Sequence, residues 1–387
     1  MKQNPHFDLL VVGGGVLGTF HAYHALNLGL RVALVERNLV PIGATVRNFG
    51  QIVPSGMNLK WQNYGRQSLE VYHHLQAQTD ISIRQNGSIY LASDAEELQL
   101  IEELHEINRA NDYSSQLLTA QQCLAQYPSL KATYCKGGLF FPDEMSANPR
   151  EMIRKVQAYL NTQPLFSHFP GTAISQIDHS GPGCIATDSR GNTYSAEKMV
   201  ICSGSEFSLL YPELFAESDL EVVQLQMLRL APQPSVQIPG NILTGLSIRR
   251  YESFADCPSW KAVKARETSD TFWKKWGVHI LFKQEVDGSI ILGDSHEYAD
   301  VKERDSLDFD IKEEISRYFV EEGKKIFALD NWEIQTQWMG VYSQGKTHDI
   351  YQKTLDNKVF IVTGIGGKGM TASPGFSASH IQKIFSL

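Results

Sequence analysis

The sequence predicts an α/β domain with a parallel sheet, joined to an α+β domain with an antiparallel sheet. An apolar run at 8–12, a helical pattern at 19–28 and a second apolar run at 31–35 together predict a strand, a helix and a parallel strand. Farther along the chain, residues 278–293 form two apolar runs around Asp287-Gly288, which predicts an antiparallel hairpin. We therefore expect two sheets of different type.

The composition is that of a large globular protein. Of its 387 residues, 42% are hydrophobic and 10% aromatic, which is enough to bury the cores of two domains. The net charge of −8 argues against a general nucleic-acid-binding or anionic-membrane surface. Residues 1–8 lack the features of a signal peptide, and we find no transmembrane segment, so we expect a cytoplasmic protein. Five scattered cysteines predict reduced thiols.

The segment that follows the first three elements reads as an insertion. Helical spacing predicts helices at 58–78 and 94–111, and residues 81–92 read as two strands paired around Asn86-Gly87. Asn148-Pro149 then opens a helix, because a proline needs no N–H group in the first helical turn. We expect the chain to return to the first domain here.

The second half alternates extended and helical segments. Three extended runs at 172–201 predict a β-meander that ends in another central strand, and the alternation at 223–227 predicts a strand of the antiparallel sheet. A helix is expected at 311–327, a strand at 358–363 and a last helix at about 374–385.

Three spaced glycines lie between the first strand and the first helix. Gly13, Gly15 and Gly18 form the pattern GxGxxG, in which the backbone approaches a pyrophosphate at a helix N-terminus. Glu36 ends the second strand, where its carboxylate can bind an adenosine ribose and repel a 2′-phosphate. The pattern predicts a Rossmann-like domain that binds FAD or NAD, not NADP. A glycine-rich turn without a ligand is the alternative.

Later segments distinguish FAD from NAD. Residues 45–50 follow the second strand, residues 202–204 follow a later apolar strand, and the glycine-rich residues 364–369 precede the last helix. Together with the aromatic-proline stretch at 138–142, they resemble the D-amino-acid oxidase, glycine oxidase and sarcosine oxidase superfamily of flavoenzymes. The resemblance runs over nearly the whole chain and implies FAD as the cofactor, bound by a domain of the glutathione-reductase type.

The same resemblance implies which residues bind FAD. In that family the N-terminus of the last helix points at the flavin pyrimidine ring, where it stabilises negative charge. Lys368 then either reinforces this effect or reaches the substrate, with a surface lysine as the alternative. A Walker A loop is excluded, because Gly369 follows Lys368 and Val362 replaces the first glycine. The implied FAD-binding residues are Gly13, Gly15, Val16, Leu17, Gly18, Glu36, Arg37, Thr45, Arg47, Asn48, Gly50, Ala173, Ile174, Ser203, Gly204, Gly364, Gly366, Gly367, Lys368, Gly369, Met370 and Thr371.

Within the superfamily, residues 46–50, 247–254 and 292–298 resemble a bacterial subgroup associated with aminophosphonate breakdown. The sequence departs from that subgroup at 51–57 and at Arg250. The resemblance implies hydride transfer to flavin N5 from the carbon next to the nitrogen of a small amine or amino-acid-like substrate, with an aminophosphonate as the finer hypothesis. A D-amino-acid, glycine or sarcosine type of oxidase or dehydrogenase is the alternative.

Arginine forks and tyrosine hydroxyls suit an anionic substrate group. The substrate-binding candidates are Arg47, Arg249, Tyr251, His279, His296 and Lys368. A structural role for His279 is the alternative. We assign no metal ligand and no catalytic acid or base, because binding the neutral amine already supplies the electron push.

Two further features receive no catalytic role. Asp294-Ser295-His296 superficially resembles part of a hydrolase triad, but adjacent residues on a strand point to opposite faces. Trp332, Trp338 and Tyr342 either wall the flavin and substrate pocket or pack in the core.

We expect the FAD-binding domain to consist of residues 1–80, 145–220 and 335–387, and the substrate-binding domain of residues 81–144 and 221–334. The expected partners are a small-molecule amine and an electron acceptor, which is oxygen, a quinone or another carrier. Two other classes of function compete with this hypothesis. One is an NAD-linked dehydrogenase, and the other is a non-catalytic flavoprotein that serves as a subunit or electron carrier.

Overall fold

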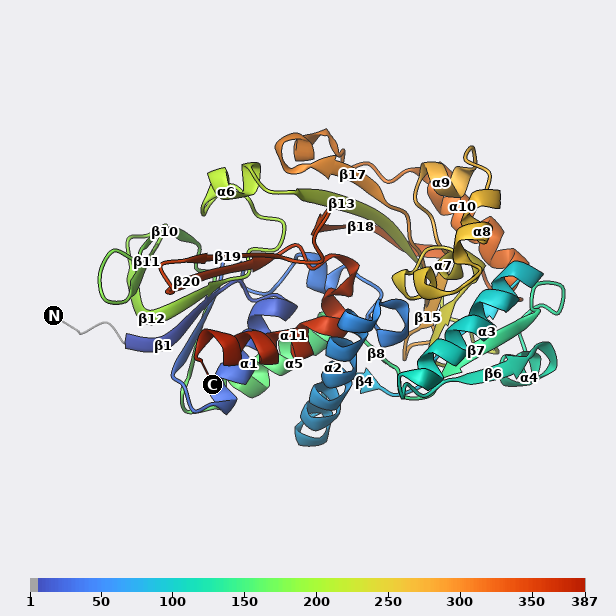
Figure 1. Ribbon diagram of the computed structural model, residues 1–387, viewed down its shortest axis with the longest axis horizontal. Coiled ribbons are helices and arrows are strands. Elements are labelled where there is room, and N and C mark those ends of the chain that lie inside the picture. Colours follow the sequence, from blue (N-terminus) through green and yellow to red (C-terminus); the bar gives the residue numbers. More distant parts are fainter. Residues whose placement is uncertain (1–5, 387) are drawn as a thin grey trace.

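The computed structural model describes residues 6–386 and contains two large sheets side by side (Figure 1). In the first sheet the strand order is β10-β11-β12-β1-β2-β9, with β20 beside β12 and β19 beside β20. Strands β9, β2, β1, β12 and β20 are parallel to their neighbours in this set, as predicted. The strands are β1 (His6–Val12), β2 (Val32–Glu36), β9 (Phe166–Pro170), β10 (Ile174–Asp178), β11 (Cys184–Asp188), β12 (Thr193–Ile201), β19 (Tyr351–Leu355) and β20 (Val359–Thr363).

Both faces of the first sheet are buried. Leu9 and Val11 of β1 pack in the core beneath the helices, whereas Leu10 faces the core on the opposite side of the sheet. This alternation follows from the two-residue period of a strand. The helices on the first face are α1 (Val16–Asn27), α2 (Leu59–Gln78), α5 (Pro149–Leu160) and α11 (Gly369–Ile384). The β10–β12 meander confirms the prediction for 172–201.

The second sheet is antiparallel for most of its width, in the order β17-β13-β16-β15-β14-β5-β7-β6, and β18 pairs with β13. The hairpin of β15 and β16 confirms the prediction around Asp287-Gly288. Because β18 belongs to this sheet, we move the proposed domain boundary from 335 to after Gly345. The strands are β5 (Ser88–Ala92), β6 (Gln116–Thr119), β7 (Gly137–Phe141), β13 (Leu220–Leu230), β14 (Asn241–Leu243), β15 (Leu281–Gln284), β16 (Ile290–Gly293), β17 (Glu297–Asp300) and β18 (Ile334–Gly345).

The predicted pairing within residues 81–92 is wrong. A small third sheet contains β3 (Gln51–Ile52), β8 (Met145–Ala147) and β4 (Ile83–Arg84), whereas β5 joins the second sheet. The N–H group of Gly87 donates to the main-chain oxygen of Glu144, so the chain passes from one sheet to the next at this glycine. The Asn86-Gly87 pair correctly predicts a turn, but the strands on its two sides belong to different sheets and do not form a hairpin.

The remaining helices flank the sheets. The predicted helices at 94–111 and 311–327 are confirmed as α3 and α10. These helices are α3 (Ala95–Ala110), α4 (Ala120–Gln126), α6 (Pro212–Ala216), α7 (Gly245–Ile248), α8 (Trp260–Arg266), α9 (Phe272–Lys275) and α10 (Glu313–Ile326). Short 3₁₀ turns occur at η1 (Ala44–Val46), η2 (Pro54–Gly56), η3 (Glu252–Asp256), η4 (Val301–Ser306) and η5 (Gly366–Lys368).

The last helix begins five residues earlier than predicted. Pro374 was expected in its first turn, but α11 begins at Gly369 and contains Pro374 in its interior. A proline there deprives the oxygen four residues earlier, that of Met370, of its helical N–H donor. The hydroxyl of Tyr72 donates to this oxygen instead, at 2.7 Å. A neighbouring helix therefore supplies the missing hydrogen bond.

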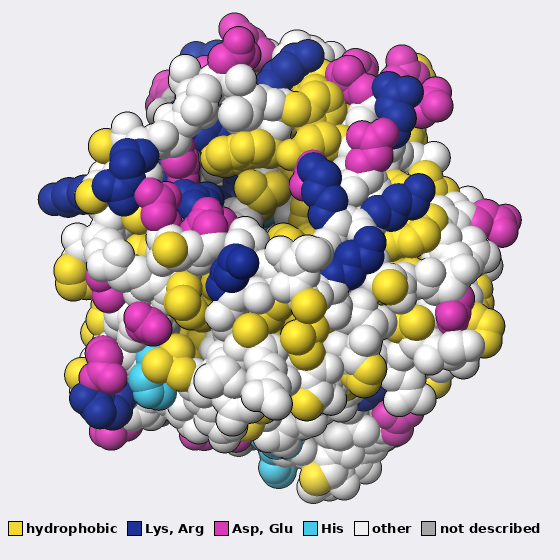
Figure 2. Space-filling model, turned by 90° about the vertical axis from the view of Figure 1, so that its right-hand side faces the viewer, with side chains coloured by type: hydrophobic (Ala, Val, Ile, Leu, Met, Phe, Trp, Pro, Cys, Tyr) yellow, Lys and Arg dark blue, Asp and Glu magenta, His cyan; other side chains and the backbone are white. Residues whose placement is uncertain are grey.

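The surface carries charges of both signs. On the face shown in Figure 2, lysines and arginines alternate with aspartates and glutamates, without a broad basic area. This agrees with the negative net charge. No helix within residues 6–386 is long and apolar enough to cross a membrane.

Candidate active site

A cavity of about 620 Å³ begins at the glycine-rich turn between β1 and α1. Gly13 has a φ of +104°, and a Cβ atom there would lie 2.3 Å from the main-chain oxygen of Cys202. Gly15 is the N-cap of α1 and has no side chain of its own that could cap this helix end. A Cβ atom on Gly18 would lie 1.9 Å from the main-chain oxygen of Gly13. Gly18 therefore permits close packing of α1, and does not line the cavity.

The carboxylate of Glu36 lies beside this turn at the end of β2. Its Oε2 atom accepts the N–H group of Gly14 at 2.8 Å, and its Oε1 atom accepts that of Asn38 at 2.8 Å. These bonds hold the carboxylate on the cavity wall. Because Oε1 also accepts a bond from Asn38 Nδ2 at 3.1 Å, Oε2 is the oxygen that keeps a further lone pair for a ligand. The neighbouring Arg37 also lines the cavity and pairs with Glu206 at 2.6 Å.

The segment 44–50 crosses the start of α1. The hydroxyl of Thr45 accepts the N–H group of Val16 at 2.9 Å, so this segment is fixed against the helix N-terminus. Asn48 stabilises the turn through its own side chain, which accepts the N–H group of Gly50 at 2.7 Å. Gly50 itself is not part of the cavity wall, because its Cα faces the main-chain oxygen of Ala147. Its predicted contact with FAD is therefore not supported.

The N-terminus of α11 borders the middle of the cavity. Gly364 and Gly366 have φ values of +73° and +67°, which turn the chain from β20 into the helix. The Gly369 N–H group donates to the main-chain oxygen of Gly366. The helix has neither a side-chain cap nor an acidic residue in its first turn, so the positive end of its dipole is available to a ligand. Thr371 supports a neighbouring loop by accepting the N–H group of Val53 at 3.1 Å.

Most of the predicted FAD-binding residues share this one cavity. Gly18 and Gly50 do not line it, and the remaining ones do. The lining residues are Gly13, Gly15, Val16, Leu17, Glu36, Arg37, Thr45, Arg47, Asn48, Ala173, Ile174, Ser203, Gly204, Gly364, Gly366, Gly367, Lys368, Gly369, Met370 and Thr371. Four segments that lie far apart in the sequence thus meet around one space.

The wall also contains polar atoms that lack partners. Ser203 Oγ and Gln51 Nε2 are buried and make no hydrogen bond with any residue in the part of the chain that the structure describes. Buried polar groups are rarely left unpaired in native proteins. Together with the N-termini of α1 and α11 and the carboxylate of Glu36, these atoms fit the ribose, pyrophosphate and flavin of FAD.

The far end of the cavity lies against the second sheet. Tyr251, His279 and His296 line it, as do Arg47 and Lys368, so five of the six predicted substrate-binding candidates reach the cavity. They come from segments around α7, β15 and β16, from the turn after η1, and from the start of α11.

The prediction for Arg249 needs correction. Its side chain is 11% exposed and pairs with Asp94 at 2.7 Å, Glu96 at 3.2 Å and Glu97 at 2.8 Å. It does not line the cavity, whereas the next residue, Arg250, does. Successive residues after a helix point in different directions, so the sequence could not show which of the two arginines faces the ligand.

The cations of the cavity wall differ in their partners. Lys368 pairs with Glu252 at 2.7 Å, and Arg37 pairs with Glu206. Arg250 and Arg47 have no carboxylate within 4.0 Å among residues 6–386. The guanidinium of Arg250 instead donates to the main-chain oxygen of Gly277 at 3.2 Å and to the hydroxyl of Tyr298 at 2.8 Å. Its charge therefore remains available to an anion in the cavity.

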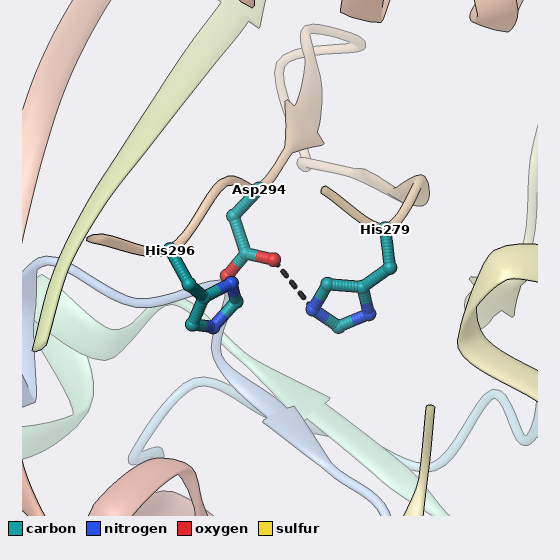
Figure 3. Close-up of side chains that lie close together, drawn as sticks. All are labelled: His279, Asp294 and His296. Carbon is teal, nitrogen blue, oxygen red and sulfur yellow. Dashed lines mark ion pairs between the residues drawn. The ribbon is translucent and has the colours of Figure 1, made fainter. Parts of the chain in front are cut away.

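A cluster of three side chains lies beside Arg250. Figure 3 shows the carboxylate of Asp294 between the imidazoles of His279 and His296. His279 Nε2 lies 2.6 Å from Asp294 Oδ1, and His296 Nδ1 lies 3.0 Å from the main-chain oxygen of Gly277. Ser295, between the two cluster residues, points away from them, and its hydroxyl oxygen accepts the N–H group of Gln226 at 3.1 Å.

Burial decides the charge states in this cluster. Burial, with a further contribution from the nearby Arg250, lowers the pKa of His296 to about 3, so this imidazole is neutral. Burial also opposes ionisation of Asp294, but His279, His296 and the Arg250 guanidinium outweigh it and hold the pKa of this carboxyl below its usual value. Burial raises the pKa values of Tyr251 and Tyr342, which therefore keep their protons.

The spacing of the cluster does not suit a tetrahedral metal ion. Its three ligand-type atoms lie within 4.8 Å of one another. Two ligands at about 2.1 Å from a tetrahedral ion lie roughly 3.4 Å apart, whereas His279 Nε2 and Asp294 Oδ1 are 2.6 Å apart. The adjacent Arg250 would also repel a cation. We assign no metal to this cluster.

Sequence reasoning missed Arg250, Asp294 and Gln51 as cavity residues. The spacing of Asp294 and His296 was an available signal, because residues two apart in an extended segment face the same side. Of the three aromatic residues predicted either to wall the pocket or to pack in the core, Tyr342 lines the cavity. Trp338 instead donates to the main-chain oxygen of Arg47, and Trp332 packs against Gly323.

Comparison with curated proteins finds relatives among amine-oxidising enzymes. The mitochondrial sarcosine dehydrogenase of Mus musculus is 28% identical over 148 residues, which are 37% of this chain and 16% of that protein. The glycine oxidase of Geobacillus kaustophilus is 24% identical over 214 residues, which are 51% of this chain and 55% of that protein. These alignments span less than two thirds of either relative.

Comparison with solved structures shows the fold. The crystal structure of glycine oxidase from Geobacillus kaustophilus has a TM-score of 0.76 at 16% identity, covering 98% of this chain and 95% of that one. L-proline dehydrogenase from P. horikoshii has a TM-score of 0.80 at 17% identity, covering 99% of this chain and 94% of that one. The predicted fold class is thereby confirmed.

A family comparison covers almost the entire chain. Residues 8–380 match the family DAO, described as FAD dependent oxidoreductase. This range includes the glycine-rich turn after β1, the cavity and the start of α11. The chain therefore belongs to the DAO family of FAD-dependent oxidoreductases, which confirms the predicted cofactor and class of enzyme.

Proposed function

We propose that the protein oxidises the C–N bond of a small amine that also carries an anionic group, with an aminophosphonate as the preferred substrate. The observation that carries this proposal is the position of Arg250 and Asp294 on one wall of the cavity. A free cation and a buried carboxylate suit the two charges of a zwitterion. The family match and the names of the relatives, glycine oxidase and sarcosine dehydrogenase, support an amine as the reacting group.

We further propose that FAD is held by the predicted residues that line the cavity, without Gly18 and Gly50. Glu36 would bind the adenosine ribose, the start of α1 the pyrophosphate, and the start of α11 the flavin pyrimidine edge. The bound flavin would supply a two-electron acceptor for hydride. The protein's own task is to orient the amine, because a well-oriented substrate removes most of the entropic cost of the reaction.

The anionic end of the substrate is proposed to bind Arg250. A phosphonate dianion gains more from an unpaired guanidinium than a carboxylate does, since charge-assisted hydrogen bonds strengthen with charge. Tyr251 also lines this end of the cavity and keeps its proton, so its hydroxyl can donate a further hydrogen bond. Arg47 is the second cation without a carboxylate partner among the described residues.

An anaerobic flavin-reduction screen tests the proposal. The purified protein is mixed with glycine, sarcosine, D-alanine, 2-aminoethylphosphonate and N-methylated 2-aminoethylphosphonate, and flavin absorbance is followed. The phosphonates are expected to bleach the flavin fastest. Faster bleaching by glycine, sarcosine or D-alanine would leave an amine oxidoreductase and remove the phosphonate. A flavin that no amine bleaches would favour a non-catalytic subunit or electron carrier.

A further inference from the structure

We propose that the carboxylate of Asp294, assisted by His279, binds the ammonium nitrogen of the substrate and accepts its proton. The inference rests on the proposed function, because it concerns the amine of that reaction. It assigns Asp294 as a catalytic residue and His279 as its positioning partner, roles that neither the family match nor the names of the relatives supply.

The protonation state of the substrate gives such a group a role. Aliphatic amines resemble the lysine side chain, whose pKa is about 10, so they reach the enzyme as ammonium ions at neutral pH. An ammonium nitrogen has no lone pair and cannot supply electrons while hydride leaves the neighbouring carbon. The site therefore either binds only the small fraction of substrate that is neutral, or binds the ammonium ion and accepts its proton.

Asp294 is buried and lacks hydrogen bonds that a carboxylate normally makes. Its side chain is 9% exposed, and Oδ1 has no hydrogen-bond donor of suitable geometry within residues 6–386, although His279 Nε2 lies 2.6 Å away. An unsatisfied buried carboxylate is costly. Because Asp294 lines the cavity, a ligand that donates N–H groups would satisfy it.

His279 provides the support for the transferred proton. Its Nε2 atom faces Asp294, and its Nδ1 atom lies 3.3 Å from the hydroxyl of Ser247, which can act as donor or acceptor. A proton that arrives at Asp294 can thus be shared with the imidazole. His296 does not compete for it, since burial keeps this side chain neutral and its Nδ1–H group is directed at the Gly277 oxygen.

The charged and titratable groups around Asp294 come from several elements. His279 precedes β15, His296 precedes β17, Arg250 and Tyr251 follow α7, and Tyr342 belongs to β18. Among these neighbours Arg250 is the permanent cation, and it lies beyond ion-pair distance of Asp294. The two charges are therefore separate, which suits a substrate with an ammonium group at one end and an anion at the other.

The proton step is balanced without an additional reactant. One N–H bond of the ammonium ion breaks, and one O–H bond forms at Asp294, so both formal charges disappear. The electron pair of the broken N–H bond stays on nitrogen and supports loss of hydride from the neighbouring carbon to the acceptor. After the product leaves, Asp294 returns the proton to solvent.

Binding of an amine that cannot be oxidised isolates this step. The probes are 2-aminoisobutyrate and (1-amino-1-methylethyl)phosphonate, whose amine carbon bears no hydrogen, and the method is titration calorimetry of the FAD-loaded protein in buffers of different ionisation enthalpy. The parent protein is expected to bind the phosphonate at pH 7 and release about zero protons, because the ammonium ion binds with its proton, which stays in the complex between the nitrogen and Asp294. Release of about one proton by the parent would overturn the proposal without any variant.

Asp294→Asn supplies the second measurement. This variant keeps the shape of the side chain but must bind the neutral amine, so it is expected to release about one proton, and its affinity should fall about tenfold for each pH unit below the amine pKa. Asp305→Asn makes the same change at a fully exposed aspartate and should behave as the parent. Unchanged affinity and proton release in Asp294→Asn would contradict the inference.

The two proposals fail differently. If no amine in the screen bleaches the flavin, the proposed function itself is wrong. If amines bleach the parent and Asp294→Asn at equal rates from pH 6 to pH 10, the function stands and the role of Asp294 is wrong. Flavin absorbance and the thermal midpoint of Asp294→Asn show whether the variant has kept its fold and cofactor.

Discussion

The hydroxyl of Tyr72 donates a 2.7 Å hydrogen bond to the main-chain oxygen of Met370. This bond joins α2 to the first turn of α11, at the oxygen that Pro374 leaves without its helical partner. Both groups are buried, so no water can replace the hydroxyl. The start of α11 is also the part of the helix that borders the cavity. Tyr72, on a helix that is far from α11 in the sequence but packs against it, thereby supports the wall of the candidate active site.

Tyr72→Phe should therefore destabilise the protein. Removal of the hydroxyl leaves a buried oxygen unsatisfied, which typically costs about 1–3 kcal/mol of unfolding free energy. Urea denaturation measures the loss. Tyr64→Phe, on the same helix, is the control, because its hydroxyl makes no hydrogen bond with the described residues, and its stability should change by less than about 0.5 kcal/mol. Equal stability of the two variants would contradict the role of Tyr72.

Gly15→Val should abolish FAD binding. Gly15 is the N-cap of α1, and a branched side chain would occupy the space that the pyrophosphate needs. Flavin absorbance of the purified protein and the rise of its thermal midpoint on adding FAD measure retention. Gly181→Val is the control, since an added Cβ at Gly181 meets nothing within 4 Å. Retained flavin in Gly15→Val would show that the phosphates bind elsewhere.

Glu36→Arg should weaken FAD binding less completely than Gly15→Val. The substitution removes the acceptor for the ribose and the anchor for the Gly14 N–H group, and it places a bulky cation on the cavity wall. FAD titration of the apoprotein, followed by flavin fluorescence, gives the dissociation constant. A dissociation constant equal to that of the parent would rule out Glu36 as the ribose-binding residue.

The two adjacent arginines should respond differently to replacement by alanine. Arg250→Ala should raise the Michaelis constant for a phosphonate-bearing amine at least about tenfold and that for an amine with an uncharged tail much less, because only the phosphonate loses a charge-assisted bond. Arg249→Ala should leave the ratio of the two Michaelis constants unchanged. It should lower the unfolding free energy by about 3 kcal/mol, because the buried Glu97 loses its ion-pair partner. Kinetics with both substrates and urea denaturation test the pair. The opposite pattern would restore Arg249 as the anion-binding residue.

The buried Glu144 should make stability depend on pH. Burial raises the pKa of this carboxyl to about 7 from an ordinary value near 4.5, while its Oε1 atom accepts bonds from Ser55 N and the Tyr113 hydroxyl. The folded state therefore binds more protons than the unfolded state between pH 4.5 and 7. Unfolding free energy should fall as pH rises through this window, by up to about 3 kcal/mol, and then level off.

Glu144→Gln removes this titration and keeps an oxygen acceptor. The variant should lose the part of the pH slope that lies between pH 4.5 and 7, and should be the more stable protein at pH 8. Urea denaturation at four or five pH values measures both slopes. If parent and variant have parallel pH profiles, Glu144 is ionised throughout the range and burial does not control its charge.

Local pattern was sufficient for much of the FAD-binding region. Strand, glycine-rich turn and helix follow one another directly at 6–27, so their geometry depends on neighbouring residues. The same holds for the hairpin of β15 and β16 and for the amphipathic helices α5 and α10, whose periodicity records which face is buried. Glu36 could be placed because it ends a strand that the pattern had already located.

Tertiary structure decided the features that depend on distant partners. Gly87 lies between two sheets because its N–H group donates to the main-chain oxygen of Glu144. Helix α11 continues through Pro374 because the Tyr72 hydroxyl donates to the Met370 oxygen in place of the N–H group that proline lacks. Arg250 faces the cavity and Arg249 faces three carboxylates, although the two are neighbours in sequence. Sequence by itself determined the family fold and cofactor, since these follow from local periodicity and glycine spacing. Three-dimensional packing determined which charged side chains face the substrate end of the cavity, because the surroundings of each one consist of residues from separate segments of the chain.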